Sequence, residues 1–479
     1  MSDNKSLVKE ITNMDVDFAQ WYTDIVKKAE LCDYSSVKGC MIIEPYGFAI
    51  WENIQHILDS EFKKVGVKNC AMPMFIPESL LNKEKDHVEG FAPECAWVTL
   101  GGSEILEEKL CVRPTSETLF CDYYSNVIKS YRDLPKLLNQ WVSVVRWEKT
   151  TRPFLRSREF YWQEGHTAHK NAEESKEFTI KMLNVYSDFV ENCLAIPVIK
   201  GQKSEREKFA GAVETYTIEA LMHDGKALQS ATSHNFGEGF AKAFKIQYLN
   251  DKGQLDFVHQ TSWGLSTRII GAIIMVHGDN EGLKLPPKIA PIQVMVVPIK
   301  IKDENNLKVA KELTEQLKQI GIRAEIDLTD KSPGFKFAEC EMRGIPLRIE
   351  IGPKDIENQK CVFVRRDTKE KFDVMLPVVQ DEVKTVLEYI QKNMFDMAKS
   401  HLESHINTAV TKDEMIKKLD ENPGFIKAMH CGDEECEKAL KDETGITVRC
   451  IPFEQDKISD ICPICGKPAK YQALYGRAY

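Results

Sequence analysis

Long apolar runs are missing from this 479-residue chain. None reaches the roughly 18 apolar residues that a membrane-spanning helix needs, so we expect no membrane-embedded part. The N-terminal segment is polar and lacks the apolar stretch of a secretory signal. Without a secretory context, the 14 scattered cysteines favour free thiols or metal ligands over disulfides. We therefore expect a cytoplasmic protein.

Three common nucleotide-binding and hydrolase signatures are also absent. The sequence has no Walker A run, no Gly-x-Gly-x-x-Gly after a predicted strand and no nucleophile elbow. A phosphate cradle made of glycines is therefore excluded. The net charge of −9 argues against indiscriminate nucleic-acid binding, although a local basic surface could still meet one RNA. The length allows two or three domains, and 43% hydrophobic residues can fill their cores.

The stretch from Trp141 to His169 predicts an antiparallel hairpin, because two strand-like runs flank a loop rich in turn formers. Alternate residues of a strand share a face, so the returning strand presents Phe160, Trp162 and Glu164 together. An aromatic plane, a carboxylate and a nearby cation suit a nucleotide beside an amino acid. For an isolated Arg-x-Glu, the alternative is a plain two-stranded ribbon with weak surface ion pairs.

The order Arg-x-Glu, loop, Arg-x-Phe resembles motif 2 of the class II aminoacyl-tRNA synthetases. The longer run RSREFYWQEGHTAH is similar to the prolyl-tRNA synthetases in particular. The resemblance implies that Arg146 binds the α-phosphate of ATP and the amino-acid carboxylate, and that Glu148 reads the adenine amino group. It also implies that Phe160 stacks on adenine and that Arg156 and Ser157 contact the triphosphate.

The tripeptide Thr115-Ser116-Glu117 opens a predicted helix. Taken alone, it is typical of an N-cap with an acidic first turn. Beside the hairpin it resembles the Thr-Ser-Glu loop of prolyl-tRNA synthetases, which implies that Thr115 and Glu117 accept the secondary amine of proline through charge-assisted hydrogen bonds. The same resemblance completes the proline pocket with Trp162, Glu164 and His166, where the indole offers an aromatic wall.

Two later segments continue the resemblance. In the prolyl family, the residues that match Gln229 and Thr232 contact ATP, and the one that matches His234 belongs to the proline site. Taken alone, the segment is typical of the polar end of a strand. Ser266 and Arg268 open an apolar run that resembles motif 3. This implies that Arg268 holds the triphosphate with Ser266 beside the nucleotide. The alternative is a buried helix with one arginine that reaches the surface.

A long amphipathic helix is predicted, with an apolar stripe from Ile50 to Phe62 and an end near Gly66. Followed by a strand from Asn69 to Met74, it resembles motif 1, the dimer-interface element of the class. The family thus implies a homodimer, whereas periodicity alone favours an ordinary core helix and edge strand. About a hundred residues separate Gly165 from Trp263, the low end for one domain. Core elements use most of them, so we expect no inserted editing domain, as in the archaeal and eukaryotic type.

The expected fold class is α+β, in three domains. Residues 1–285 would form a class II catalytic core on an antiparallel sheet. Residues 286–393 alternate strands and helices and resemble an α/β anticodon-binding domain. Its weak candidates for reading bases, which RNA-binding proteins stack upon or meet with polar groups, are Phe337, Glu341, Arg348 and Asp355. Ion pairing or core packing would explain each of them equally well.

Residues 394–479 would form a small α/β zinc-binding domain. Cys431 and Cys436 have four residues between them, and Cys462 and Cys465 have two. Paired cysteines in a reduced compartment suit a structural tetrahedral Zn²⁺ site with four thiolates and no open position. The spacing resembles the C-terminal domain of archaeal-type prolyl enzymes, and free buried thiols are the alternative. Cys450 lies in an apolar strand and is expected in the core.

Together the resemblance implies that ATP, with Mg²⁺, activates L-proline and that the prolyl group passes to the 3′ end of tRNA(Pro). Arg146 and Arg268 would be catalytic through positioning and charge stabilisation, without a side-chain nucleophile. One alternative is another class IIa synthetase, which Glu117, Trp162 and His166 together oppose. The other is a non-catalytic tRNA-binding paralogue, which the intact Arg146, Glu148 and Arg268 oppose. Tyr479 is expected to pack near the active site.

Overall fold

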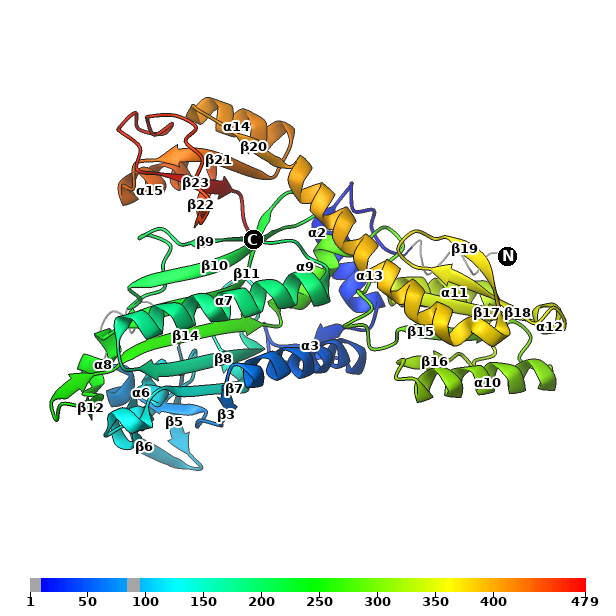
Figure 1. Cartoon of the computed structure of the whole chain (residues 1–479), viewed down its shortest axis with the longest axis horizontal. Helices are drawn as coiled ribbons and strands as arrows, with labels where there is room; N and C mark the ends of the chain where they lie inside the picture. The colour runs from blue at the N-terminus through cyan, green and yellow to red at the C-terminus, as the bar shows by residue number, and fades with distance from the viewer. Residues whose placement is uncertain (1–9, 84–94) are drawn as a thin grey trace.

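The computed structural model of the chain describes residues 10–83 and 95–479. Within them, an eleven-stranded sheet, a five-stranded sheet and three smaller sheets combine with helices (Figure 1). The expected α+β class is confirmed. No helix in this described part of the chain is both long and apolar enough to cross a membrane.

The predicted hairpin lies within the large sheet. Its strands pair antiparallel, from Lys136 opposite Ala168 to Val145 opposite Glu159. The sequence suggests a first strand from Trp141 and a return strand from Arg158 to Gly165. In the structure the strands reach back to Lys136 and on to His169, and β8 is paired on both edges, by β7 and by β14. We call the part of the structure that falls in the predicted catalytic core, residues 1–285, the catalytic unit. Its part of the large sheet runs in the order β9-β10-β11-β14-β8-β7-β3. Its strands are β3 (Lys68–Asn69), β7 (Lys136–Val145), β8 (Glu159–His169), β9 (Ile199–Gln202), β10 (Glu214–Leu221), β11 (Ala227–Gly237) and β14 (His259–Ser266).

Helix α7 (Ala172–Leu194) covers one face of this sheet (Figure 1). It begins where the Asn171 side chain accepts a hydrogen bond from the backbone N–H of Glu174 at 2.8 Å, a standard N-cap. Its apolar stripe, which includes Phe178 and Met182, is buried against the strands. The other helices of the catalytic unit are α2 (Phe18–Lys28), α3 (Pro45–Lys64), α4 (Glu78–Leu81), α6 (Glu117–Val127), α8 (Gly239–Phe244) and α9 (Arg268–His277), with the 3₁₀ turn η3 (Tyr131–Asp133).

The strand predicted from Asn69 to Met74 is wrong in extent, because β3 ends at Asn69. Beyond it, side chains satisfy the backbone. Met72 donates its N–H to Oε1 of Gln140 at 3.0 Å, and Arg113 donates Nη1 to the Met72 carbonyl at 2.9 Å. A backbone that is paired in this way needs no strand partner.

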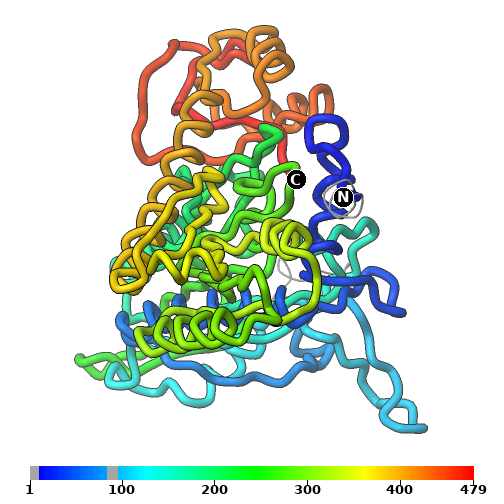
Figure 2. Tube along the Cα trace, turned by 90° about the vertical axis from the view of Figure 1, so that its right-hand side faces the viewer, coloured from blue at the N-terminus to red at the C-terminus, as the bar shows by residue number. Residues whose placement is uncertain are grey.

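A small sheet of β4 (Phe75–Pro77), β6 (Glu104–Val112) and β5 (Ala96–Gly101) extends away from the body as an arm (Figure 2). Two short ribbons complete the catalytic unit. They pair β1 (Cys32–Tyr34) with β2 (Met41–Ile43), and β12 (Gln247–Leu249) with β13 (Leu255–Phe257).

The second unit confirms the predicted alternation of strands and helices. Its sheet has the order β16-β15-β17-β18-β19. The elements are β15 (Val294–Pro298), α10 (Glu304–Gln319), β16 (Ala324–Ile326), α11 (Pro333–Met342), β17 (Leu347–Ile351), α12 (Pro353–Glu357), β18 (Lys360–Arg365), β19 (Lys371–Met375) and η4 (Leu376–Val378). Helix α13 (Val379–Ser404) then runs on without a break through residue 393, where the sequence suggests a domain boundary.

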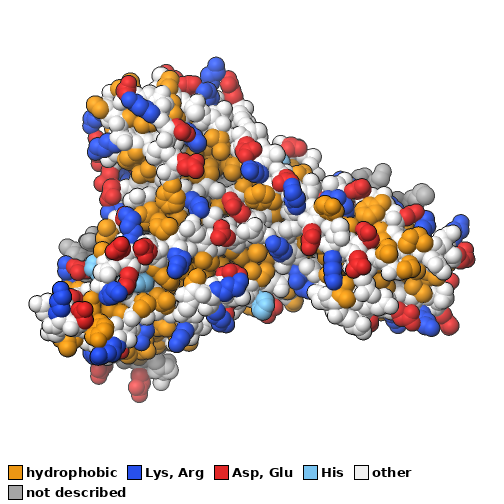
Figure 3. Space-filling view, viewed as in Figure 1, with side chains coloured by type: hydrophobic (Ala, Val, Ile, Leu, Met, Phe, Trp, Pro, Cys, Tyr) orange, Lys and Arg blue, Asp and Glu red, His pale blue; other side chains and the backbone are white. Residues whose placement is uncertain are grey.

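The third unit joins the catalytic sheet. Its strands run β20-β21-β23-β22, and β22 pairs with β9, which makes the sheet continuous. Sequence patterns did not predict this pairing. Charges of both signs are interspersed over the face seen in Figure 3. The elements are β20 (Ile406–Thr408), α14 (Lys412–Glu421), β21 (Phe425–His430), α15 (Glu434–Thr444), β22 (Thr447–Pro452) and β23 (Tyr471–Gly476), and Cys450 is buried as expected.

Candidate active site and metal centre

A cavity of about 200 Å³ opens on the large sheet beside the hairpin. Strands β8, β11 and β14 and the start of α6 contribute its walls. The shared face predicted for the returning strand is confirmed, because Phe160, Trp162 and Glu164 all line the cavity. The predicted site residues that meet there are Thr115, Glu117, Arg146, Phe160, Trp162, Glu164, His166, Gln229, Thr232, His234, Ser266 and Arg268.

Glu164 is the most heavily hydrogen-bonded group of the cavity, and only 2% of its surface is exposed. It accepts hydrogen bonds from the Ser116 hydroxyl (2.5 Å) and N–H (3.1 Å) and from Gln140 Nε2 (2.7 Å), and His166 Nε2 lies 3.0 Å away. Burial alone raises the pKa of Glu164, but His166, Ser116 and Gln140 outweigh it and hold the pKa below its usual range. The carboxylate therefore stays ionised and attracts a small cation.

The start of α6 supplies two more buried polar groups. The Thr115 hydroxyl donates to the Glu117 carboxylate, and both side chains are at most 5% exposed. Ser116 occupies the N-cap position but makes no capping hydrogen bond, since its hydroxyl donates to Glu164 instead. The tripeptide therefore does more than begin a helix.

Two arginines line the cavity, Arg146 and Arg268. The Arg146 guanidinium lies 5.6 Å from the ring centroid of Phe160 and 5.2 Å from that of Trp162. Arg268 donates Nε to the Leu155 carbonyl at 3.1 Å. Burial, with the neighbouring Arg156 and Arg146, lowers the pKa of Arg268 to about 10. Cations held this close repel one another, and a polyanion placed between them would relieve the repulsion.

Three predicted nucleotide residues do not line this cavity. Glu148 and Arg156 form an ion pair at 3.4 Å. Arg156 lines a neighbouring cavity of about 310 Å³ with Arg268 and Tyr479, so the expectation for Tyr479 is confirmed. Ser157 lines a third cavity of about 330 Å³ that also borders Phe160.

His234 is held between two threonines. The Thr215 hydroxyl lies 3.0 Å from its Nδ1, and the Thr232 hydroxyl lies 3.0 Å from its Nε2. Burial, then the nearby His166 and Arg146, lowers the pKa of His234 to about 3. The ring is therefore neutral at physiological pH and serves as a hydrogen-bonding wall.

One residue behind the cavity wall and two that line the cavity escaped the sequence analysis. Gln140 lies directly opposite Glu164 in the β7–β8 pairing, so the hairpin register could have revealed it. The Phe209 ring packs 4.6 Å from His234, and Glu207 lies on the same loop. No pattern in the sequence marks that loop, because its place over the cavity depends on contacts distant along the chain.

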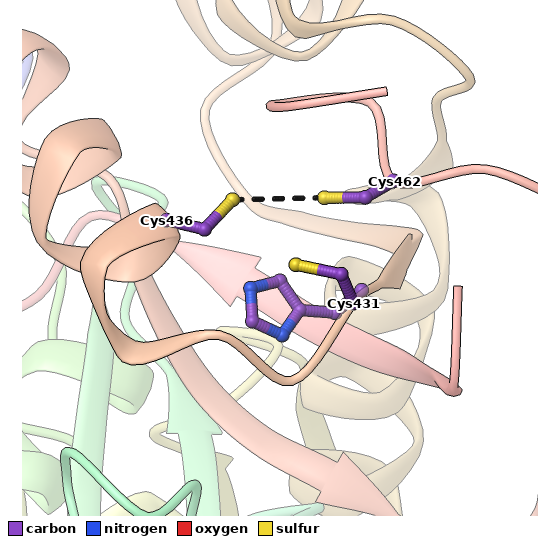
Figure 4. A group of neighbouring side chains, drawn as sticks. Cys431, Cys436 and Cys462 are labelled. Carbon is purple, nitrogen blue, oxygen red and sulfur yellow. Dashed lines mark hydrogen bonds between the residues drawn. The ribbon is translucent and has the colours of Figure 1, made fainter. Parts of the chain in front are cut away.

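The four predicted metal cysteines cluster in the third unit. Cys436 and Cys462 point toward each other with sulfurs 3.7 Å apart (Figure 4), and the Cys431 and Cys465 sulfurs are 3.5 Å apart. One ring nitrogen of His430 and the sulfurs of Cys431, Cys436 and Cys462 all lie within 4.8 Å of one another. A tetrahedral Zn²⁺ site with Zn–S bonds of about 2.3 Å separates its sulfurs by about 3.8 Å. The four cysteine sulfurs therefore fit a tetrahedral Zn²⁺ ion.

Comparison with known proteins assigns each unit. Residues 100–277 match the class II tRNA synthetase core domain (G, H, P, S and T), residues 293–392 the anticodon-binding domain, and residues 412–479 the prolyl-tRNA synthetase C-terminal domain. Over the full length of both chains, the sequence is 63% identical to the proline–tRNA ligase of Lachnoclostridium phytofermentans and 62% identical to that of Clostridium novyi. The chain belongs to the proline–tRNA ligase family.

A third relative, proline–tRNA ligase 2 of Bacillus cereus, is 59% identical over 99% of this chain and all of its own. Between β8 and β14, all residues belong to the α7–β13 elements and their loops. Elements of the large sheet and the helix that covers it therefore occupy this stretch of the chain.

Three of the four candidates for reading anticodon bases lie together in the second unit. The Arg348 guanidinium lies 4.2 Å from the Phe337 ring centroid and 3.2 Å from the Glu341 carboxylate. The ion-pairing alternative thus describes Arg348 in this structure. Asp355 has a different partner, since it accepts the Gly352 N–H at 2.8 Å and caps α12.

Proposed function

We propose that this chain ligates L-proline to tRNA(Pro) in two steps, through a prolyl-adenylate. The observation that carries the proposal is the pairing, in one cavity, of a buried ionised carboxylate at Glu164 with the arginines Arg146 and Arg268. The carboxylate suits the secondary ammonium of proline. The two arginines suit the carboxylate of proline and the phosphates of ATP.

In the proposed proline site, Glu117 and Thr115 accept hydrogen bonds from the ring ammonium, and Glu164 supplies the balancing charge. Trp162 and His166 form the walls, and His234 closes the site as a neutral ring. Phe120 stacks on His166 at 4.3 Å and so fixes that wall. A small apolar ring then replaces water in the cavity.

In the proposed ATP site, Phe160 stacks on adenine and Glu148 reads its amino group. The remaining contacts would come from Arg156, Ser157, Gln229, Thr232 and Ser266. Arg268 binds the triphosphate, where phosphate oxygens would also bring in Mg²⁺, which prefers oxygen ligands. Glu148 and Arg156 now pair with each other, so nucleotide binding would exchange that ion pair for contacts with ATP.

The chemistry needs no side-chain nucleophile. A carboxylate oxygen of proline attacks the α-phosphorus, the bond to the bridging oxygen breaks, and pyrophosphate leaves. Arg146 neutralises the charge that develops on the α-phosphate. The 3′-terminal ribose hydroxyl of tRNA then attacks the prolyl carbonyl, and AMP leaves.

The wider assignments complete the proposal. We infer domains at 1–285, 286–393 and 394–479, with α13 shared by the last two. We infer that the anticodon bases are bound by Arg348, Phe337, Glu341 and Asp355. Structural Zn²⁺ would be held by Cys431, Cys436, Cys462 and Cys465, and a homodimer would form through α3. All 14 cysteines lie in the described residues as free thiols, which supports a cytoplasmic location.

The test is ATP–pyrophosphate exchange without tRNA, measured with each of the twenty amino acids. Proline should support exchange, and Arg146→Ala should abolish it. Arg132→Ala is the matched control, because Arg132 belongs to η3 and stacks on Tyr131 outside the cavity. Exchange led by another amino acid would identify a sibling class IIa enzyme. No exchange with any amino acid would favour a tRNA-binding paralogue.

A further inference from the structure

His430 lies directly before the first proposed zinc ligand and is fully buried. Its Nδ1 is already engaged. The Gly432 backbone donates its N–H to that atom at 3.0 Å, and the Tyr471 hydroxyl lies 3.3 Å away. A ring nitrogen that accepts a hydrogen bond carries no proton, so this pattern assigns the ring proton to Nε2.

The Nε2–H group has no hydrogen-bond partner among the described residues. Buried donors are rarely left in this state, and each one calls for an explanation such as an ion or a bound group. Sulfurs lie close by, because a ring nitrogen of His430 and Sγ of Cys431, Cys436 and Cys462 all lie within 4.8 Å of one another. Nδ1 is occupied, so Nε2 is the nitrogen that is free to face them.

The sulfur separations suit a site of four thiolates, in which His430 is not a ligand. The distances of 3.5 and 3.7 Å are close to the edge of a four-thiolate Zn²⁺ tetrahedron, about 3.8 Å. Four thiolates around a divalent ion leave a net charge of −2 on the cluster. Hydrogen-bond donors around metal ligands commonly offset such charge and fix the ligands in place.

We propose that His430 donates its Nε2–H to a thiolate sulfur of the zinc cluster and thereby positions that ligand and strengthens metal binding. The inference rests on the proposed zinc site. In this arrangement Gly432 and Tyr471 contact Nδ1 on one side of the imidazole, and a cluster sulfur accepts the hydrogen bond from Nε2–H on the other. His430 is a positioning residue and does not coordinate the metal.

The experiment compares the full chain with His430→Phe, which keeps an aromatic ring but has no N–H. Zinc affinity is measured by competition with a chromophoric chelator, and bound zinc per chain by atomic absorption. We expect one zinc per chain in both proteins and an affinity about 10- to 100-fold lower in His430→Phe. His430→Gln restores an N–H donor and should recover part of the loss. His56→Phe, on the exposed side of α3, should change nothing.

Cobalt-loaded proteins distinguish a hydrogen bond from coordination. If His430 only donates a hydrogen bond, the wild-type chain and the His430→Gln variant share one four-thiolate visible spectrum. A spectrum typical of mixed nitrogen and sulfur ligation in the wild-type chain alone would overturn the proposal, as would equal zinc affinity in all variants. A wild-type chain that binds no zinc would instead remove the proposed site itself. If His430→Phe does not fold, His430→Gln decides on both readouts.

Discussion

The stability of the third unit should depend on one buried carboxylate in the catalytic part of the large sheet. Glu219 on β10 is fully buried. Its Oε2 accepts hydrogen bonds from Nη2 (2.9 Å) and Nε (3.1 Å) of Arg449 on β22, and its Oε1 accepts one from Lys203 Nζ at 2.8 Å. Replacing Arg449 by Met keeps much of the side-chain volume and removes the partner that spans the two units.

The expected cost is about 3 kcal/mol, the low end for breaking a buried ion pair, because Lys203 remains as a partner. Arg477→Met is the matched control in the same unit. Its partner Asp420 is 58% exposed, so that loss should be about 0–1 kcal/mol. The difference between the two variants isolates the effect of burial.

The defect should also depend on pH. Burial raises the pKa of Glu219, while Arg449 and Lys203 outweigh it and hold the pKa below its usual range. In the wild type, this contribution is complete above the unfolded-state pKa of about 4.3 and is lost as pH falls through the lower folded pKa. Without Arg449 the pKa rises, so protonation relieves the buried charge and the defect shrinks as pH is lowered.

Hydrogen exchange of the amides in β22 is the suitable assay, because a multidomain chain does not unfold in two states. A loss of about 3 kcal/mol should speed exchange there by about two orders of magnitude. The double variant Arg449→Met/Glu219→Gln should recover part of the protection. Equal exchange in Arg449→Met and Arg477→Met, or no recovery in the double variant, would refute the reasoning.

Three further predictions follow from other contacts. Gln140→Leu removes a hydrogen bond to the ionised Glu164, so kcat/KM for proline in pyrophosphate exchange should fall about 10- to 100-fold; an unchanged value would show that Gln140 only packs. Asp279→Asn breaks the two-pronged ion pair with Arg366, at 2.7 and 2.9 Å, that ties the second unit to the end of α9. Aminoacylation should then fall several-fold more than exchange, and equal losses would contradict this coupling role. Removal of zinc by a chelator should raise protease cleavage near α15, and unchanged cleavage would mean that the thiols need no metal.

The sequence was informative wherever the decisive contacts are local. Alternation along β8 placed Phe160, Trp162 and Glu164 on one face, and cysteine spacing identified the four thiols that cluster. Longer-range contacts were beyond these patterns. The strand expected after Asn69 stops because Gln140 and Arg113 capture its backbone, and the salt bridge between Glu219 and Arg449 joins residues far apart in the chain. The free N–H of His430 likewise depends on a turn whose geometry only the fold defines.

The central claim is that Glu164 and Arg146 together select proline and activate it for transfer to tRNA. Its most direct test is a single-turnover assay that follows labelled proline onto a tRNA(Pro) transcript in excess wild-type enzyme and in excess Glu164→Gln enzyme. The account predicts rapid formation of prolyl-tRNA(Pro) by the wild type and a loss of at least tenfold in the variant, because the buried charge opposite the ring ammonium is gone. No transfer by the wild type, or undiminished transfer by Glu164→Gln, would contradict it.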